Sequence, residues 1–282
     1  MATPRRTLAS EAIAKGIALH AGVPAALRLY PAPPGTGIVF RRRDQPNSEI
    51  PALWSNVTET RLGTVIANNG ASVGVVEHLL SALAGAEVDD CIAEVDGPEP
   101  PILDGDAASY LTVIEQAGFV VNGGARKTIR VLKPVAVGND VEGARLLPAA
   151  RAEYFFEIAF KSAVIGHQTF EFVFSPDSYR KEIAPARTFG FLHDAEKLRA
   201  AGFGRGADVT NTLVLDGDRL INASLQRFPD EFVRHKILDA IGDMNLAGAP
   251  LVARYEGRRS SHKLNTALLE ALFANPANYE IG

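Results

Sequence analysis

The stretch DEFVRHKILDAIGD, residues 230–243, combines an apolar helical face with a strip of polar side chains. At about 100° per residue, with His235 at zero, Asp239 lies near 40°, Asp243 near 80° and Lys236 near 100°. His235 and Asp239 are therefore neighbours on the helix that can converge on one ion. An isolated pair of this spacing most often belongs to a solvated, charged face, but it also supplies two of the three protein ligands of a catalytic zinc site. Asp243 lies one turn further on, where a residue supporting a ligand would lie.

Length and charge limit the classes of protein to which the chain can belong. It has 282 residues and a formal net charge of −4, with both signs mixed along the chain. This length indicates one large domain or two medium ones with a sizeable core. No arginine-rich stripe supports nucleic-acid binding. The apolar runs are shorter than the roughly 20 residues of a membrane span, and the N-terminus lacks a signal-peptide core. We expect no nucleic-acid partner and no membrane span.

Cys91 is the only cysteine in the chain. A single thiol excludes an intrachain disulfide and a cysteine-rich zinc cluster, and it fits a reducing compartment. We therefore expect a cytoplasmic protein. A metal site would have to be built from carboxylates and from the six histidines, which are His20, His78, His167, His193, His235 and His262.

Two series of strands, each followed by helices, predict an α+β fold. The first series contains the strand candidates AALRLYPAP, IVFRRR and GTVIANNGAS and a helix, VVEHLLSALAG, that Gly85 would end. The second contains RKTIRVLKPVAV, AEYFFEIAF and HQTFEFVF, followed by DEFVRHKILDAIGDMNLAG and SHKLNTALLEALFA as helices. Between them, the glycines and basic residues of NGGARK, residues 122–127, predict a boundary between domains 1–124 and 125–282.

Short internal similarities suggest that the two series are related. RLYPA at 28–32 and RLLPA at 145–149 occupy similar places in the two series. EHLLSALAG and RHKILDAIG both carry His at their second position and Gly at their ninth. Matches of this length also arise by chance. A duplication would give two similar α+β halves that face one another, with a site between them.

Two further stretches carry candidate catalytic side chains. Glu77 and His78 begin a helix among aliphatic residues, where a charge is either buried with a role or partner, or solvated at the helix end. His262 lies in RRSSHKLN, just before a helix, where it is either a polar cap or a catalytic group. Together with His235 and Asp239 they match a hydrolytic metal centre: two histidines and a carboxylate as ligands, a glutamate base and a histidine acid. No H-E-x-x-H, P-loop or dinucleotide motif is present.

Six stretches, in one order and over most of the chain, resemble a known family. They are GIALHAG, RLYPAPPGTGIVFRR, VEHLLSALAG, EVDGPEPPILDG, ARTFGFLHDAEKLRAAG and DEFVRHKILDAIGD. The chain resembles the zinc-dependent UDP-3-O-acyl-N-acetylglucosamine deacetylases of lipid A biosynthesis. The resemblance implies two similar α+β domains packed as a β-α-α-β sandwich, with the active site between them. It also implies hydrolysis of the N-acetyl amide of an acylated UDP-amino sugar, with release of acetate.

The resemblance also implies the roles of individual residues. Glu77 would be the general base that takes a proton from the attacking water. His262, held by Asp243, would be the acid that protonates the leaving amine. Zn²⁺ would be the cofactor, although Fe²⁺ also suits two histidines and a carboxylate. The ligands of the metal would be His78, His235 and Asp239.

Further residues would meet the substrate. Thr188, in RTFGF, would assist the oxyanion, and Phe189 and Phe191 would contact the substrate. Lys236 would face its polar part, in particular a phosphate. The expected partner is this small molecule, and the chain is expected to be a monomer.

The chain departs from the family's pattern beside the catalytic histidine. Ser261 occupies the place where the family usually has glycine, which would allow positive φ or close approach of the backbone. Two alternatives to the enzyme therefore stay open at this point. One is a non-catalytic or altered-specificity paralogue that binds a nucleotide sugar or acylated sugar, and the other is a protein that binds no metal.

Overall fold

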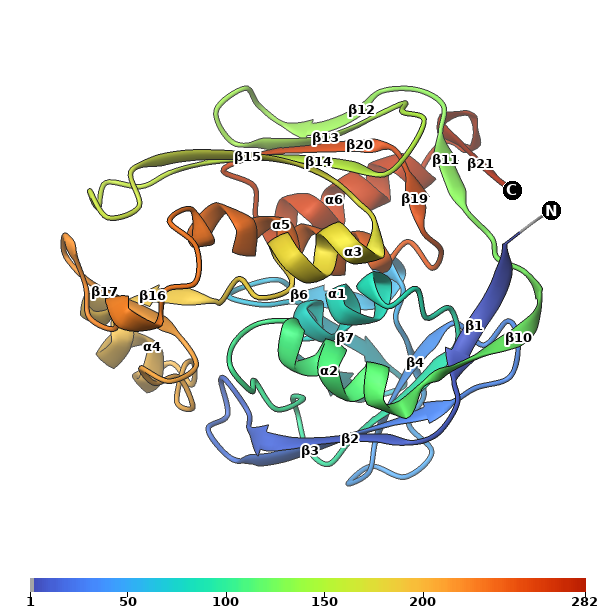
Figure 1. Ribbon diagram of the computed structural model, residues 1–282, viewed down its shortest axis with the longest axis horizontal. Coiled ribbons are helices and arrows are strands. Elements are labelled where there is room, and N and C mark those ends of the chain that lie inside the picture. Colours follow the sequence, from blue (N-terminus) through green and yellow to red (C-terminus); the bar gives the residue numbers. More distant parts are fainter. Residues whose placement is uncertain (1–2) are drawn as a thin grey trace.

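The computed structural model describes residues 3–282 and confirms the α+β fold class. Figure 1 shows the long helices in the middle of the molecule, with a sheet above them and a sheet below them. The helices are α1 (Glu77–Gly85), α2 (Ala108–Ala117), α3 (Pro176–Ser178), α4 (Ala195–Ala200), α5 (Glu231–Asn245) and α6 (His262–Phe273). Short 3₁₀ turns lie at Trp54–Asn56, Leu192–Asp194, Ala223–Leu225 and Pro276–Asn278, and a π-helical turn at Tyr179–Ile183.

The lower sheet has five strands and packs one face on the helices. In spatial order they are β2 (Ala12–Ile17), β3 (Pro24–Pro31), β9 (Cys91–Val95), β4 (Ile38–Arg42) and β5 (Ile50–Pro51). β4 and β9 are parallel, and the other neighbours are antiparallel. Along β3, buried residues alternate with more exposed ones, as expected of a strand with one face on the core.

The upper sheet repeats this topology. Its strands, in spatial order, are β12 (Val135–Gly138), β13 (Gly143–Leu147), β20 (Arg254–Arg258), β14 (Glu153–Ala159) and β15 (His167–Val173). β14 and β20 are parallel and the other neighbours antiparallel, as in the lower sheet. RLYPA and RLLPA begin near the ends of β3 and β13, the second strand of each sheet, and run into the loops that follow. The equal strand order supports the duplication that these short similarities suggested.

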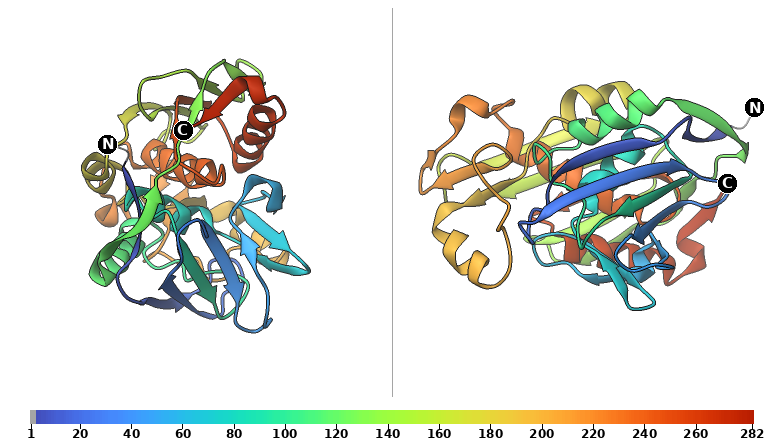
Figure 2. Two further views of the ribbon diagram at one scale, coloured as in Figure 1. Left: turned by 90° about the vertical axis from the view of Figure 1, so that its right-hand side faces the viewer. Right: turned by 90° about the horizontal axis from the view of Figure 1, so that it is seen from below.

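Four smaller sheets complete the fold. β1 (Pro4–Leu8) pairs with β10 (Phe119–Ala125), and β11 (Ile129–Val131) lies between β19 (Leu251–Val252) and β21 (Tyr279–Ile281). β7 (Val65–Asn68) lies between β6 (Val57–Glu59) and β8 (Ala71–Val73). β16 (Phe189–Phe191), β17 (Leu213–Asp216) and β18 (Arg219–Leu220) form, with α4, a lobe at one side (Figures 1 and 2). The predicted boundary falls in the last residues of β10, and the division into domains stays a prediction.

Two glycines let α1 pack closely against its neighbours. A Cβ on Gly242 of α5 would lie 2.0 Å from the carbonyl oxygen of Glu77. A Cβ on Gly85 would lie 2.1 Å from the ring of Tyr179, so packing explains why glycine occupies the predicted end of α1. The start of α1 thus lies against the last turns of α5, and this contact brings two distant parts of the chain together.

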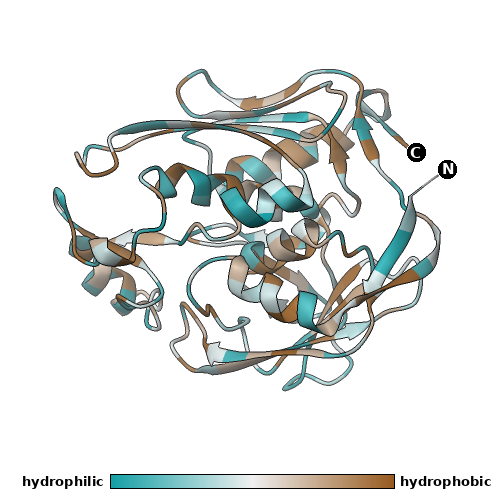
Figure 3. Ribbon diagram, viewed as in Figure 1, coloured by the Kyte–Doolittle hydropathy of each residue, from teal (hydrophilic) through white to brown (hydrophobic). Residues whose placement is uncertain are grey.

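Apolar side chains fill the space between the two sheets and the helices. Figure 3 shows hydrophobic residues recurring on the strands of both sheets and on α1. Leu79, Leu80 and Leu83 of α1 are fully buried, as are Ile237 and Leu238 of α5. In the part of the chain that the structure describes, no helix combines the length and the apolar character needed to span a bilayer.

Candidate active site

Three predicted ligands meet where α1 crosses α5. His78 comes from the first turn of α1, and His235 and Asp239 from successive turns of α5. One donor atom from each lies within 4.8 Å of the other two. Nε2 of His78 is 3.5 Å, and Nε2 of His235 is 3.3 Å, from Oδ1 of Asp239. All three side chains are buried, with Asp239 only 4% exposed, so this part of the α5 strip is not a solvated face.

The unpaired atoms of this group suit a divalent cation. Nδ1 of His78 and Oδ1 of Asp239 are buried and have no hydrogen-bond partner among residues 3–282. Nδ1 of His235 donates to the carbonyl oxygen of Ala186 at 3.1 Å, which leaves the Nε2 lone pair facing Asp239. Burial lowers the pKa of His235 to about 3, which keeps the imidazole in the neutral form that binds metals. Two histidines and a carboxylate are a donor set for zinc or iron(II).

Lys236 binds one of the two carboxylate oxygens of Asp239. Its Nζ donates to Oδ2 of Asp239 at 2.7 Å, so Oδ1 is left on the side of the histidines. Burial opposes the charged form, but the charge of Asp239 raises the pKa of Lys236, and the lysine stays charged. The same Nζ lies 5.9 Å from the centre of the Phe189 ring.

Glu77 lies next to this group at the first residue of α1. Its carboxylate is buried, and Oε2 accepts a hydrogen bond from the backbone N–H of Thr64 at 3.0 Å. Its other oxygen, Oε1, is 3.9 Å from Nε2 of His262. Burial raises the pKa of Glu77, and a higher pKa makes a carboxylate a stronger base.

His262 lies beside Glu77 and is bound by Asp243. Nδ1 of His262 donates to Oδ2 of Asp243 at 2.8 Å, and Nδ2 of Asn265 donates to the same oxygen at 2.8 Å. Oδ1 of Asp243 accepts from the hydroxyl of Thr64 at 2.7 Å. Burial acts to lower the pKa of His262, but the charges of Asp243 and Glu77 raise it to about 9. His262 is therefore protonated at neutral pH and able to donate a proton from Nε2.

The structure places two of the predicted substrate-facing residues, Thr188 and Phe189, on the segment that contacts His235. Thr188 follows the segment whose Ala186 carbonyl binds His235, and its hydroxyl makes no hydrogen bond within residues 3–282. The ring of Phe189 lies 6.3 Å from the ring of His235. Phe191, two residues further along β16, packs 5.9 Å from the ring of Phe160, without a ring contact to His235 or His78.

Ser261 fits the backbone of the loop before His262 without strain. Its φ is −138°, which is extended backbone open to any residue, so this position does not need glycine. Its hydroxyl accepts a hydrogen bond from the N–H of Leu264 at 3.4 Å and caps the start of α6. The unusual backbone of this loop lies instead at Arg259, with φ of 44°.

Sequence reasoning missed Thr64 and Asn265, which both donate hydrogen bonds to Asp243 beside His262. Asn265 could have been found, because it lies three residues after His262 on one helix and therefore on the same face. Thr64 could not, because it ends an irregular segment just before β7 and nothing in its spacing links it to α1 or α5. The carbonyl of Ala186 carries no side-chain signal at all.

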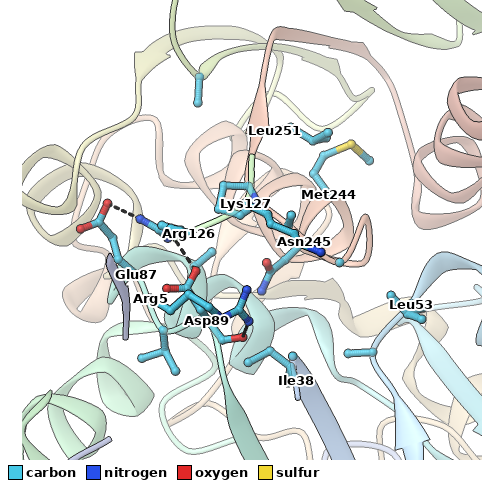
Figure 4. Close-up of a pocket in the computed structure, with 18 of the residues that line it drawn as sticks. Arg5, Ile38, Leu53, Glu87, Asp89, Arg126, Lys127, Met244, Asn245 and Leu251 are labelled. Carbon is cyan, nitrogen blue, oxygen red and sulfur yellow. Dashed lines mark hydrogen bonds and ion pairs between the residues drawn. The ribbon is translucent and has the colours of Figure 1, made fainter. Parts of the chain in front are cut away.

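A separate cavity of about 670 Å³ opens at the C-terminal ends of α1 and α5 (Figure 4). Apolar side chains such as Leu53 and Met244 line one part of it. At its polar end Arg126 pairs with Glu87 and Asp89, each at 2.8 Å. None of the ten predicted site residues lines this cavity within the described chain.

Comparison with known proteins gives the same family for nearly the whole chain. The family described as LpxC, UDP-3-O-acyl N-acetylglycosamine deacetylase, matches residues 5–274. A protein of Phenylobacterium zucineum named UDP-3-O-acyl-N-acetylglucosamine deacetylase is 43% identical over 280 residues, which are 98% of this chain and 96% of the relative.

Two further relatives carry the same name. The protein of Myxococcus xanthus is 43% identical over 279 residues, covering 98% of this chain and 88% of the relative. The protein of a Nitratiruptor species is 40% identical over 277 residues, covering 98% and 93%. A family match over residues 5–274, together with relatives of this identity and coverage, shows that the chain belongs to the UDP-3-O-acyl N-acetylglycosamine deacetylase family.

Proposed function

We propose that this chain is a metal-dependent hydrolase that removes the N-acetyl group of UDP-3-O-acyl-N-acetylglucosamine, a step of lipid A biosynthesis, and releases acetate. The observation that carries the proposal is the buried group of His78, His235 and Asp239, with Glu77 and His262 beside it. The names of the relatives support the choice of substrate.

The metal we propose is zinc, with iron(II) as the other cation that suits the same donors. His78, His235 and Asp239 would hold it, because one donor atom of each lies within 4.8 Å of the other two and Oδ1 of Asp239 is buried with no hydrogen-bond partner in residues 3–282. When bound, such a metal polarises an amide carbonyl and makes water more acidic.

Glu77 and His262 then divide the proton transfers between them. Glu77 takes a proton from water as the oxygen–carbon bond forms, and His262 gives the proton of Nε2 to the nitrogen as the carbon–nitrogen bond breaks. The products are acetate and a free amine. The raised pKa of each group suits its task, since Glu77 becomes a better base and His262 stays protonated. Asp243 keeps the second proton of His262 on Nδ1.

The remaining predicted residues would bind the substrate around this centre. The free hydroxyl of Thr188 would donate to the oxygen of the acetyl carbonyl as charge develops on it. Phe189 and Phe191 would offer apolar surface. The exposed part of Lys236 would face a phosphate, although Nζ also binds Asp239.

We also propose that the enzyme acts as a monomer in the cytoplasm. Every candidate donor and both proton-transfer groups come from one chain. The single cysteine, Cys91, is buried and free, as suits a reducing compartment.

The test is acetate release by purified protein whose metal content is measured on the same sample. Glu77→Gln should lower turnover by about 100-fold or more while the metal stays bound, because general base catalysis contributes at least that much. Glu256→Gln is a matched control, since Glu256 is also buried but pairs with Arg145 and Arg254. Normal turnover by Glu77→Gln would remove the role given to Glu77. Wild-type protein that binds the acylated UDP-sugar without releasing acetate would instead indicate a non-catalytic paralogue.

A further inference from the structure

Thr64 connects the two groups that transfer protons. Its side chain is fully buried in the segment before β7. Its backbone N–H donates to Oε2 of Glu77 at 3.0 Å, and its hydroxyl donates to Oδ1 of Asp243 at 2.7 Å. One residue therefore binds both the proposed base and the carboxylate that holds the proposed acid.

The backbone of Thr64 is fixed independently of its hydroxyl. Its carbonyl oxygen accepts a hydrogen bond from the N–H of Val76 at 3.3 Å, directly before α1. With the bond to Glu77, this ties both polar atoms of its backbone to the start of that helix. A change of the Thr64 side chain can therefore alter the bond to Asp243 while the backbone bonds remain.

The hydroxyl of Thr64 orients the carboxylate of Asp243, which accepts three hydrogen bonds. Oδ2 of Asp243 accepts from both His262 and Asn265, each at 2.8 Å, so that oxygen is fully used. The hydroxyl of Thr64 is the donor to the other oxygen, Oδ1. Without it, Oδ1 would be a buried charged atom with a lost partner, and the carboxylate would be free to turn. His262 would turn with it.

Backbone conformation near Thr64 also indicates a segment shaped for this contact. Leu62 has φ of 61° and Val75 has φ of 53°, values that side-chain-bearing residues seldom adopt. Gly63 has φ of 155°, and a Cβ there would lie 3.1 Å from Oε1 of Glu77. Strained backbone that persists in a folded protein is concentrated at functional sites. Here it brings Thr64 between α1 and α5.

We propose that Thr64 is a positioning residue, which sets the separation of Glu77 and His262 for the reaction. The separation that it sets is the 3.9 Å between Oε1 of Glu77 and Nε2 of His262. A base and an acid must reach opposite sides of one scissile bond together, so small errors in their separation lower turnover more than binding. This inference rests on the proposed deacetylation.

The test is Thr64→Val, which keeps the shape and removes only the hydroxyl. Losing a hydrogen bond to a buried charged group should lower kcat about 10- to 100-fold, with KM and metal content changed less than about twofold. Thr64→Ser restores the hydroxyl and should recover kcat to within about threefold of wild type. If the valine variant is unstable, Thr64→Ala against Thr64→Ser gives the same comparison, since both lack the methyl group.

Thr7→Val is the matched control for loss of a buried threonine hydroxyl. The hydroxyl of Thr7 also makes two hydrogen bonds, to the carbonyl of Asp90 and from the N–H of Ala32. Thr7→Val should lower the melting temperature without changing kcat. A Thr64→Val enzyme with wild-type kcat, beside an active wild type, would overturn this inference alone. A wild type that releases no acetate would overturn the proposed function, and this inference with it.

Discussion

Replacing Asp243 by Asn should remove the charge that keeps His262 protonated while leaving the shape of the side chain unchanged. In the structure, Oδ1 of Asp243 accepts from Thr64 and Oδ2 accepts from His262 and Asn265. An asparagine can keep its oxygen toward His262 and direct its amide toward the hydroxyl of Thr64, which can accept as well as donate. The charge is therefore the main property that changes.

The size of the effect follows from the pKa of His262. It is about 9 in the structure, raised from 6.5 against the effect of burial by Asp243 and Glu77. Without Asp243 it should fall toward 6.5, so at about pH 7.5 the protonated fraction falls from ~97% toward ~9%. Protonation alone then accounts for up to about a tenfold loss of kcat, since only protonated His262 can act as the acid.

The assay is kcat for acetate release between about pH 5.5 and about pH 10. The alkaline midpoint should fall by about one to two units in Asp243→Asn, and lowering the pH should recover part of the activity. Asp90→Asn is the control, because Asp90 is equally buried but pairs with Arg5. An unchanged alkaline midpoint in Asp243→Asn would refute the assignment of His262 as an acid charged by Asp243.

Four other outcomes are expected. Ser261→Gly should lower the free energy of unfolding by only a few tenths of a kcal/mol, through the lost cap of α6. It should leave kcat within about twofold, because the φ of −138° needs no glycine. A large change in kcat beside a small change in melting temperature would contradict this. Gly242→Ala should destabilise the fold by about 1–3 kcal/mol in urea unfolding and weaken metal binding, because the new Cβ would lie 2.0 Å from the carbonyl oxygen of Glu77. Gly97→Ala, where the Cβ would lie in open space, should have neither effect. A strong chelator should lower the melting temperature of the wild type, since a metal at about 100 times its Kd stabilises the folded state by about 2.7 kcal/mol. The melting temperature of Asp239→Ala should not respond to the chelator. A wild-type melting temperature that does not respond would count against the metal site. The stability that His262 contributes should be fully present below about pH 6.5 and lost as the pH rises through about 9. The free energy of unfolding should change by up to about 3 kcal/mol over this range. Asp243→Asn should largely remove this pH dependence.

The sequence predicted the α+β class and the His235–Asp239 pair because both depend on short-range spacing, whereas His78 was added to the candidate metal group by the family resemblance. Residues four apart on a helix must share a face, so His235 and Asp239 could be paired from the sequence alone. The same spacing could not say whether that face was buried. That depended on the crossing of α1 and α5, which needs Gly242 against the backbone of Glu77 and is a long-range contact.

The connections around the ligands were less predictable. Thr64 acts through its backbone and hydroxyl at the end of an irregular segment, and Ala186 acts through its carbonyl, so neither has a distinctive residue type or spacing. The departure at Ser261 pointed to a strained loop, because a glycine position suggests positive φ. The structure instead has Ser261 as a helix cap, and its extended φ explains why serine fits there.

The crossing of α1 and α5 also shows how the two helices differ in role. EHLLSALAG and RHKILDAIG align so that His78 matches His235, while Glu77 matches Arg234 and Ala82 matches Asp239. Arg234 pairs with Asp230 and stacks on the ring of Phe170, so the residue that aligns with Glu77 has a structural role. The two helices share the histidines and the closing glycines, Gly85 and Gly242, whereas the proposed base and the third proposed donor each occur in one helix only. The two histidines are thus the symmetric part of the proposed metal site, and the third proposed donor and the proposed base are its asymmetric parts, found where the two similar helices differ.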